Sequence, residues 1–92
     1  MTHMTYHAQA RLQQRGIPAK VLDCLLAYGQ SIHDHQGAEI VFFDHGARNK
    51  VRKALGEVEF KKLADKLDAY AVLAPDGAVV TVGHRTKRIT RH

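Results

Sequence analysis

Apolar side chains first recur with a helical period in the stretch 6–15, where Leu12 lies on the apolar side. Thr5 is a suitable N-cap for this helix, and Gly16 suits the left-handed conformation that ends many helices. Ile17 would then fold back onto Leu12, as in a Schellman ending. The pattern therefore predicts one short helix over 6–15.

A second helix is predicted from Pro18 to Tyr28, because proline suits the first helical position and Gly29 can end the helix. Apolar and polar residues fall on different sides, so this helix is amphipathic. The apolar side holds Val21, Leu22, Leu25 and Tyr28, and the polar side holds Lys20 and Asp23.

Helical periodicity returns at Ala47 and continues to Gly56, where a glycine interrupts it. A further helix follows Gly56, and acidic residues at its start suit the positive end of the helix dipole. Its apolar side consists of Phe60, Leu63, Ala64 and Leu67.

Four stretches instead favour strands, and they are 31–36, 38–44, 69–74 and 78–86. The first two are expected to join around Gln36-Gly37, and the last two around Pro75-Asp76-Gly77, which is the strongest hairpin signal in the chain. Residues 79–82 are apolar at both strand parities, which favours a central strand.

The predicted element order is ααββααββ. It favours an α+β domain with a roughly four-stranded antiparallel sheet and helices mainly on one face. At 92 residues the chain fits one domain, with flexible ends at 1–4 and 88–92. The sequence does not decide the strand order.

The composition is that of an ordinary globular chain, with 45% hydrophobic and 25% charged residues. No apolar run approaches the ~18 residues of a membrane span, and the polar N-terminus has no signal-peptide core, so a cytoplasmic location is expected. The single cysteine, Cys24, is expected to be a buried and unreactive thiol. The few Phe and Tyr residues are expected in the core.

The net charge of +5 is spread unevenly along the chain. Residues 1–22 and 77–92 hold only basic charges, whereas all nine acidic residues lie within 23–76. If folding brings the two ends together, their fields add to form an anion-attracting surface.

The seven histidines raise the question of metal binding. His33 and His35 alternate along a predicted strand, but no third ligand stands at a suitable spacing, so a solvated strand face is expected and neither a metal nor another cofactor. His3, His45 and His92 are expected in loops or tails.

Two groups of residues are candidates for chemistry. His7, Arg11 and Arg15 recur at every fourth position and border the buried side of the first helix, either as a cleft wall or as a row of snorkelling side chains. The second group lies in the last strand. There Thr81 and Arg85 share one face and His84 lies on the other, unless Gly83 marks a bulge that re-aims the end of the strand.

The stretch 6–32, beginning "YHAQARLQQRGIP", and the closing "DGAVVTVGHR" resemble the family called domain of unknown function 4258. Its pattern has His-Ala, a spaced Arg, Arg-Gly-Ile and a final strand bearing Thr. The resemblance covers both ends of the chain well and the middle poorly. At the level of fold, this family resembles small ribonuclease toxins of the RelE, barnase and colicin type.

The resemblance implies metal-free RNA cleavage, which needs a base, an acid and cations that stabilise the charged phosphorane. His7 and His84 would transfer the protons, and a scissile phosphate between them requires rings ~5 to 8 Å apart. Arg11 and Arg85 would hold the phosphate, and the Thr81 hydroxyl would donate to it. Arg15 and Lys87 would make peripheral contacts.

Three functions follow from these residues and from the resemblance. The first is a metal-independent endoribonuclease, which the resemblance to toxins implies is restrained by an inhibitor protein. The second is a non-catalytic module that binds nucleic acid, RNA rather than DNA, through the same basic surface. The third is a protein–protein interaction module that uses an apolar strand edge.

Overall fold

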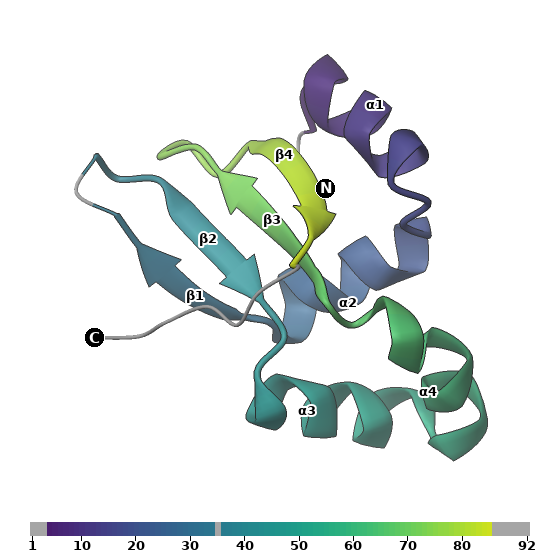
Figure 1. The fold of residues 1–92 in the computed structure, drawn as a ribbon. Coiled ribbons are helices and arrows are strands. Elements are labelled where there is room, and N and C mark those ends of the chain that lie inside the picture. Colours follow the sequence, from purple (N-terminus) through teal and green to yellow (C-terminus); the bar gives the residue numbers. More distant parts are fainter. Residues whose placement is uncertain (1–3, 35, 86–92) are drawn as a thin grey trace.

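The computed structural model describes residues 4–34 and 36–85, and its elements follow the predicted order (Figure 1). The helices are α1 (Tyr6–Gln14), α2 (Ala19–Tyr28), α3 (His45–Leu55) and α4 (Glu57–Leu63), and the 3-10 helix η1 (Ala64–Lys66) follows α4. The strands are β1 (Gln30–His33), β2 (Glu39–Phe42), β3 (Ala69–Leu73) and β4 (Val79–His84). The α+β class with a four-stranded antiparallel sheet is therefore confirmed.

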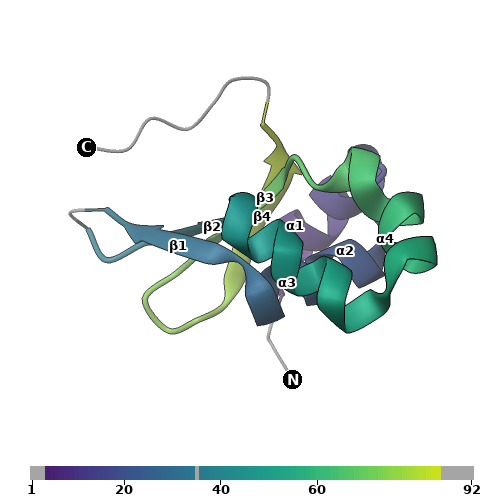
Figure 2. The same ribbon diagram turned by 90° about the horizontal axis from the view of Figure 1, so that it is seen from below.

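The strands lie in the order β1-β2-β3-β4, and every neighbouring pair is antiparallel. Helix α2 packs on β2 and β3, whereas α1 lies along β4. Helices α3 and α4 form a helical hairpin that contacts α2 (Figures 1 and 2). The two ends of the described chain thus meet at one edge of the sheet.

The main core lies between α2 and one face of the sheet. Val41, Ala71 and Val82 stand in one cross-strand row, and they belong to the same buried cluster as Val21 and Leu25 of α2. Gly29, between α2 and β1, allows this close contact. A Cβ atom there would lie 2.4 Å from the Leu25 carbonyl oxygen and 2.6 Å from Val41 Cγ1.

Helix α1 begins where predicted and ends at Gln14, one residue earlier than predicted, with Arg15 as its C-cap. The Thr5 hydroxyl oxygen accepts a hydrogen bond from the Ala8 N–H at 3.2 Å, which caps the helix. Gly16 has φ +63°, and the Ile17 N–H donates to the Leu12 carbonyl at 3.0 Å, as in the expected Schellman ending. Local sequence therefore determines both limits of α1.

Two helix starts differ from the prediction. Pro18 is the N-cap of α2 in an extended conformation, not its first helical residue. Helix α3 begins at His45, two residues before Ala47, because the Asp44 carboxylate accepts from the Ala47 N–H at 2.7 Å and caps the helix. His45 therefore lies in a helix, and the expectation of a loop there is wrong.

The prediction of a central strand at 79–82 is also wrong, because β4 is the last strand of the sheet. The chain before α1 covers its outer edge: Met4 forms a parallel bridge with Val79, and the Thr5 N–H donates to the Val79 carbonyl at 3.0 Å. Helix α1 packs along β4. The strand can therefore be apolar at both parities without a further strand beside it. Met4, expected in a flexible end, is part of this edge, whereas 1–3 and 88–92 lie outside the described residues.

The sequence left open whether Gly83 marks a bulge, and the irregularity of β4 lies elsewhere. The β3–β4 register shifts between Val72 and Leu73, which leaves Val80 as the extra residue, whereas Gly83 pairs regularly with Tyr70. The Tyr70 ring lies over Gly83, where a Cβ would be 3.0 to 3.2 Å from ring atoms. Glycine at this position makes room for the ring and does not re-aim the strand.

In the described part of the chain, none of the helices has the length and apolar character needed to cross a membrane.

Candidate nucleic-acid interface

The basic row of α1 lies on the helix that covers the β4 edge. His7 and Arg15 are exposed and Arg11 is half-buried, and α1 contains no acidic residue. We call these three side chains the α1 basic face. Backbone hydrogen bonds at Thr5 fix one end of α1 to the start of β4, so the face stands on a fixed element.

His84, the last residue of β4, holds the other end of α1. Its Nδ1 lies 2.7 Å from Asp68 Oδ1, and its Nε2 lies 2.9 Å from the Arg15 carbonyl oxygen. A carboxylate and a carbonyl oxygen both only accept, so a doubly protonated ring donates to both of them, whereas a neutral ring donates to one. We call this arrangement of Asp68, His84 and the Arg15 carbonyl the His84 clamp.

The structure does not bring His7 and His84 together. His7 is in the first turn of α1, next to the Thr5 cap that pairs with Val79, whereas His84 contacts the Arg15 carbonyl at the far end of the helix. The eight-residue rise from His7 to Arg15 is about 12 Å of helix axis. That separation exceeds the distance across one phosphate, and both ring nitrogens of His84 already have partners.

The side chains of Thr81 and Arg85 do not join His84 in one site. Thr81 is opposite Val72 in the register, whereas His84 is opposite Ala69, so the two point to different faces of the sheet. Arg85 Nη2 donates to the Phe43 carbonyl at 3.3 Å, and its Cζ lies 5.3 Å from the centroid of the Phe42 ring. Arg85 therefore holds the end of β4 to the end of β2, and Lys87 lies outside the described residues.

Five arginines lie in the described part of the chain, and they differ in what they bind. Arg48 donates to the Leu67 carbonyl at 3.1 Å, and Arg52 contacts Asn49 and Glu57. Arg85 donates to the Phe43 carbonyl. Within the described residues, neither Arg11 nor Arg15 forms an ion pair, so the α1 basic face keeps two guanidinium groups available for an anion.

Most acidic residues already stabilise the fold. The Asp34 and Asp76 carboxylates accept backbone N–H groups in the two hairpin turns, and Glu59 pairs with Lys20 and Lys62. The Lys ammonium groups beside Glu59 lower the pKa of its carboxyl, with Lys62 the larger influence and Lys20 the smaller. These contacts involve no residue of α1, and the Asp68 carboxylate is bonded to His84.

Tyr6 is 86% exposed, so the expectation that the tyrosines lie in the core is wrong for this residue. Tyr6 precedes Ala8, the buried residue of α1, by two positions, which is about 200° around a helix. Helical geometry alone thus places the ring on the side opposite the core, and this signal was present in the sequence.

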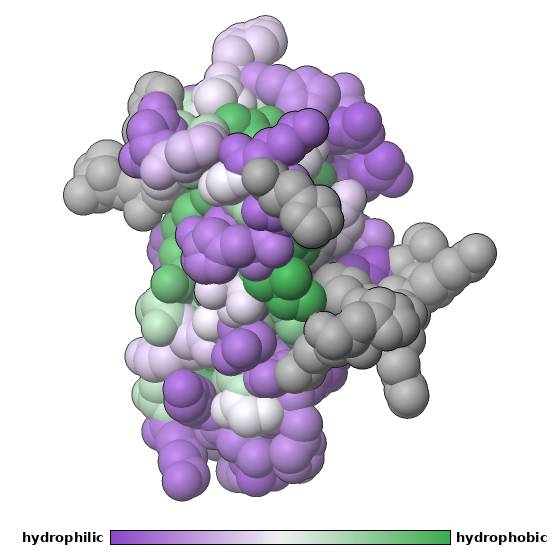
Figure 3. Space-filling model, turned by 90° about the vertical axis from the view of Figure 1, so that its left-hand side faces the viewer, coloured by the Kyte–Doolittle hydropathy of each residue, from purple (hydrophilic) through white to green (hydrophobic). Residues whose placement is uncertain are grey.

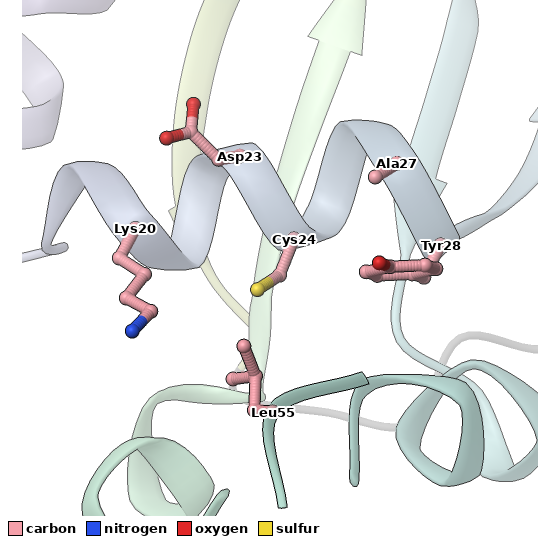
Figure 4. A pocket seen from close by; sticks show the side chains of 6 residues that line it. All are labelled: Lys20, Asp23, Cys24, Ala27, Tyr28 and Leu55. Atoms are coloured by element: carbon pink, nitrogen blue, oxygen red, sulfur yellow. The ribbon is translucent and has the colours of Figure 1, made fainter. Parts of the chain in front are cut away.

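Cys24 is buried, as expected, beside a shallow hollow of about 280 Å³ between α2 and the end of α3 (Figure 4). Its thiol points toward Leu55, with Lys20 and Tyr28 on either side along α2. Burial is the main influence and raises the pKa of the thiol, Lys20 lowers it, and Asp23 raises it further. The neutral thiol is a poor nucleophile, so the hollow has no reactive group of this kind.

No group of three or more metal-ligating side chains occurs among the described residues. His33 ends β1 in an exposed position, and His35 lies outside the described residues.

Strand β1 forms the edge of the sheet opposite β4. On the side of the molecule that lies to the left in Figure 1, apolar residues occur in separate groups between hydrophilic ones (Figure 3). On the α1 basic face, by contrast, basic side chains recur at every fourth position along one helix.

Comparisons of the chain with protein families, curated proteins and solved structures found no match. The fold and the α1 basic face define a small basic α+β protein, in which two arginines at the first helix form no ion pair within the described residues.

The His84 clamp predicts a specific loss of stability. Asp68→Ala removes a charge-assisted acceptor from His84, and because both side chains are partly exposed we expect a loss of about 1 kcal/mol in the free energy of unfolding. Chemical denaturation measures this loss, and amide exchange should locate it at the end of α1. Asp65→Ala, the same substitution in η1, is the matched control, and equal losses in both variants would contradict the clamp.

Proposed function

We propose that the protein binds RNA through the α1 basic face, with Arg11 and Arg15 as phosphate contacts and His7 beside them. The observation that carries the proposal is that these two guanidinium groups have no carboxylate partner within the described residues. Guanidinium groups bind phosphate oxygens by paired, charge-assisted hydrogen bonds. The proposal places the helices mainly on one face of the sheet and the RNA on the outward side of α1.

The proposal is for binding without cleavage. Proton transfer by two imidazoles needs both rings at one phosphate, and His7 and His84 stand at opposite ends of α1. His84 also uses both ring nitrogens in the clamp. The inhibitor protein that the family resemblance implied belongs to a cleaving toxin, so it is not part of this proposal.

The test is binding of a labelled RNA oligonucleotide measured by anisotropy over a range of KCl concentrations. With two phosphate contacts, the logarithm of the affinity should fall by about 1.4 per tenfold increase in salt on a single strand. A gel of the same RNA after incubation should show intact strands. A response that does not depend on salt would refute the phosphate contacts, and cleaved RNA would refute the non-catalytic assignment.

A further inference from the structure

We infer that Tyr6 is a stacking platform for an unpaired base, so that the ligand of the α1 basic face is single-stranded RNA. This inference rests on the proposed function and specifies its substrate. Tyr6 is 86% exposed, whereas Tyr28 and Tyr70 are half-buried. An exposed aromatic ring beside free cations is the combination with which proteins bind single strands.

The first turn of α1 holds Tyr6 in a fixed place. The Thr5 N–H donates to the Val79 carbonyl at 3.0 Å, and the Thr5 carbonyl accepts from the Gln9 N–H at 3.0 Å. The side-chain amide of Gln9 also donates to the Met4 carbonyl at 3.4 Å. Because the backbone on both sides of Tyr6 is bonded, the backbone loses little freedom when a base stacks on the ring.

One strand that follows the turn of α1 can contact both Tyr6 and the cations. His7 is adjacent to Tyr6 in sequence and about 100° away around the helix, whereas Arg11 is five residues on, which is about 7.5 Å along the axis and about 140° around it. A base stacked on Tyr6 therefore leaves a flanking phosphate near His7, and a phosphate further along the strand reaches Arg11. The ring supplies an apolar contact and the guanidinium group supplies the charge.

The same geometry discriminates against duplexes. Within a double helix both faces of each base are already stacked, so Tyr6 has no exposed base to contact. A duplex would use the arginines alone, whereas a single strand uses both the ring and the arginines. Single-stranded RNA should therefore bind more tightly than a duplex of the same sequence.

The experiment compares Tyr6→Ala, Tyr6→Phe and the wild-type protein on a labelled single-stranded RNA and on its duplex. Tyr6→Ala should weaken single-strand binding by roughly 5- to 150-fold, and Tyr6→Phe should keep most of the affinity. Duplex binding should be equal in all three proteins. Circular dichroism should show unchanged folding, because the ring is almost fully exposed.

Val58→Ala is the matched control, because Val58 is 70% exposed but lies on α4. It should leave RNA binding unchanged. If Tyr6→Ala binds the single strand as well as the wild type does, the stacking inference is wrong while the phosphate contacts survive. If the wild-type protein binds neither RNA, the proposed function itself is wrong.

Discussion

Phe43→Ala should lower the free energy of unfolding by about 3 to 5 kcal/mol. Phe43 is 1% exposed and belongs to the main buried cluster, so truncating its side chain leaves a cavity that a close-packed core cannot refill. Domains of this size are stable by only about 5 to 15 kcal/mol, so this one change removes a large share of the total. The variant should unfold at a much lower denaturant concentration.

Phe60→Ala is the control for this prediction. It deletes the same atoms from a half-buried position, where the ring packs at the margin of the core with Arg52 6.0 Å from its centroid. We expect a clearly smaller loss for Phe60→Ala in the same urea titration. Equal losses would mean that Phe43 is not packed as described.

The consequences of Phe43→Ala reach the candidate site through the backbone. Phe43 directly follows β2 and precedes the Asp44 cap of α3, and its carbonyl accepts from Arg85 at the end of β4. His84, which directly precedes Arg85, holds the end of α1. The core and the α1 basic face are therefore joined through the last residues of β4.

The sequence predicted those features that depend on neighbouring residues. The Thr5 cap, the Gly16 ending and the Pro75-Asp76-Gly77 hairpin all follow from short-range backbone chemistry. The element order and the four-stranded antiparallel sheet followed from the periodicities. The α3 start was missed because Asp44, which caps that helix, reads in sequence as part of the preceding strand.

Features that depend on distant residues were not predictable. The His84 clamp joins residues 16 and 69 positions apart in the chain, so no local pattern marks Asp68 as the partner of His84. The position of β4 at the sheet edge depends on Met4 and Thr5, whose pairing with Val79 has no sequence signal. The two acid-free ends do lie together in the described residues, as α1 and β4. Their histidines, His7 and His84, stand at opposite ends of α1.

Replacing both arginines of the α1 basic face, as Arg11→Gln with Arg15→Gln, should weaken RNA binding about 25-fold at 0.1 M salt. Two lost phosphate contacts should also reduce the salt slope by about 1.4. The clamp should remain, because it uses the backbone carbonyl of Arg15. Anisotropy titrations at several KCl concentrations measure both quantities.

The decisive comparison is with Lys50→Gln combined with Lys53→Gln, which removes two exposed cations from α3 and changes the net charge equally. Binding driven by total charge alone would weaken to the same extent in both double variants, which would contradict a defined interface on α1. A loss of RNA affinity confined to the Arg11→Gln, Arg15→Gln variant would instead mean that the phosphates bind at α1. Position and net charge are thus separated, because both variants remove two positive charges, at α1 in one variant and from α3 in the other.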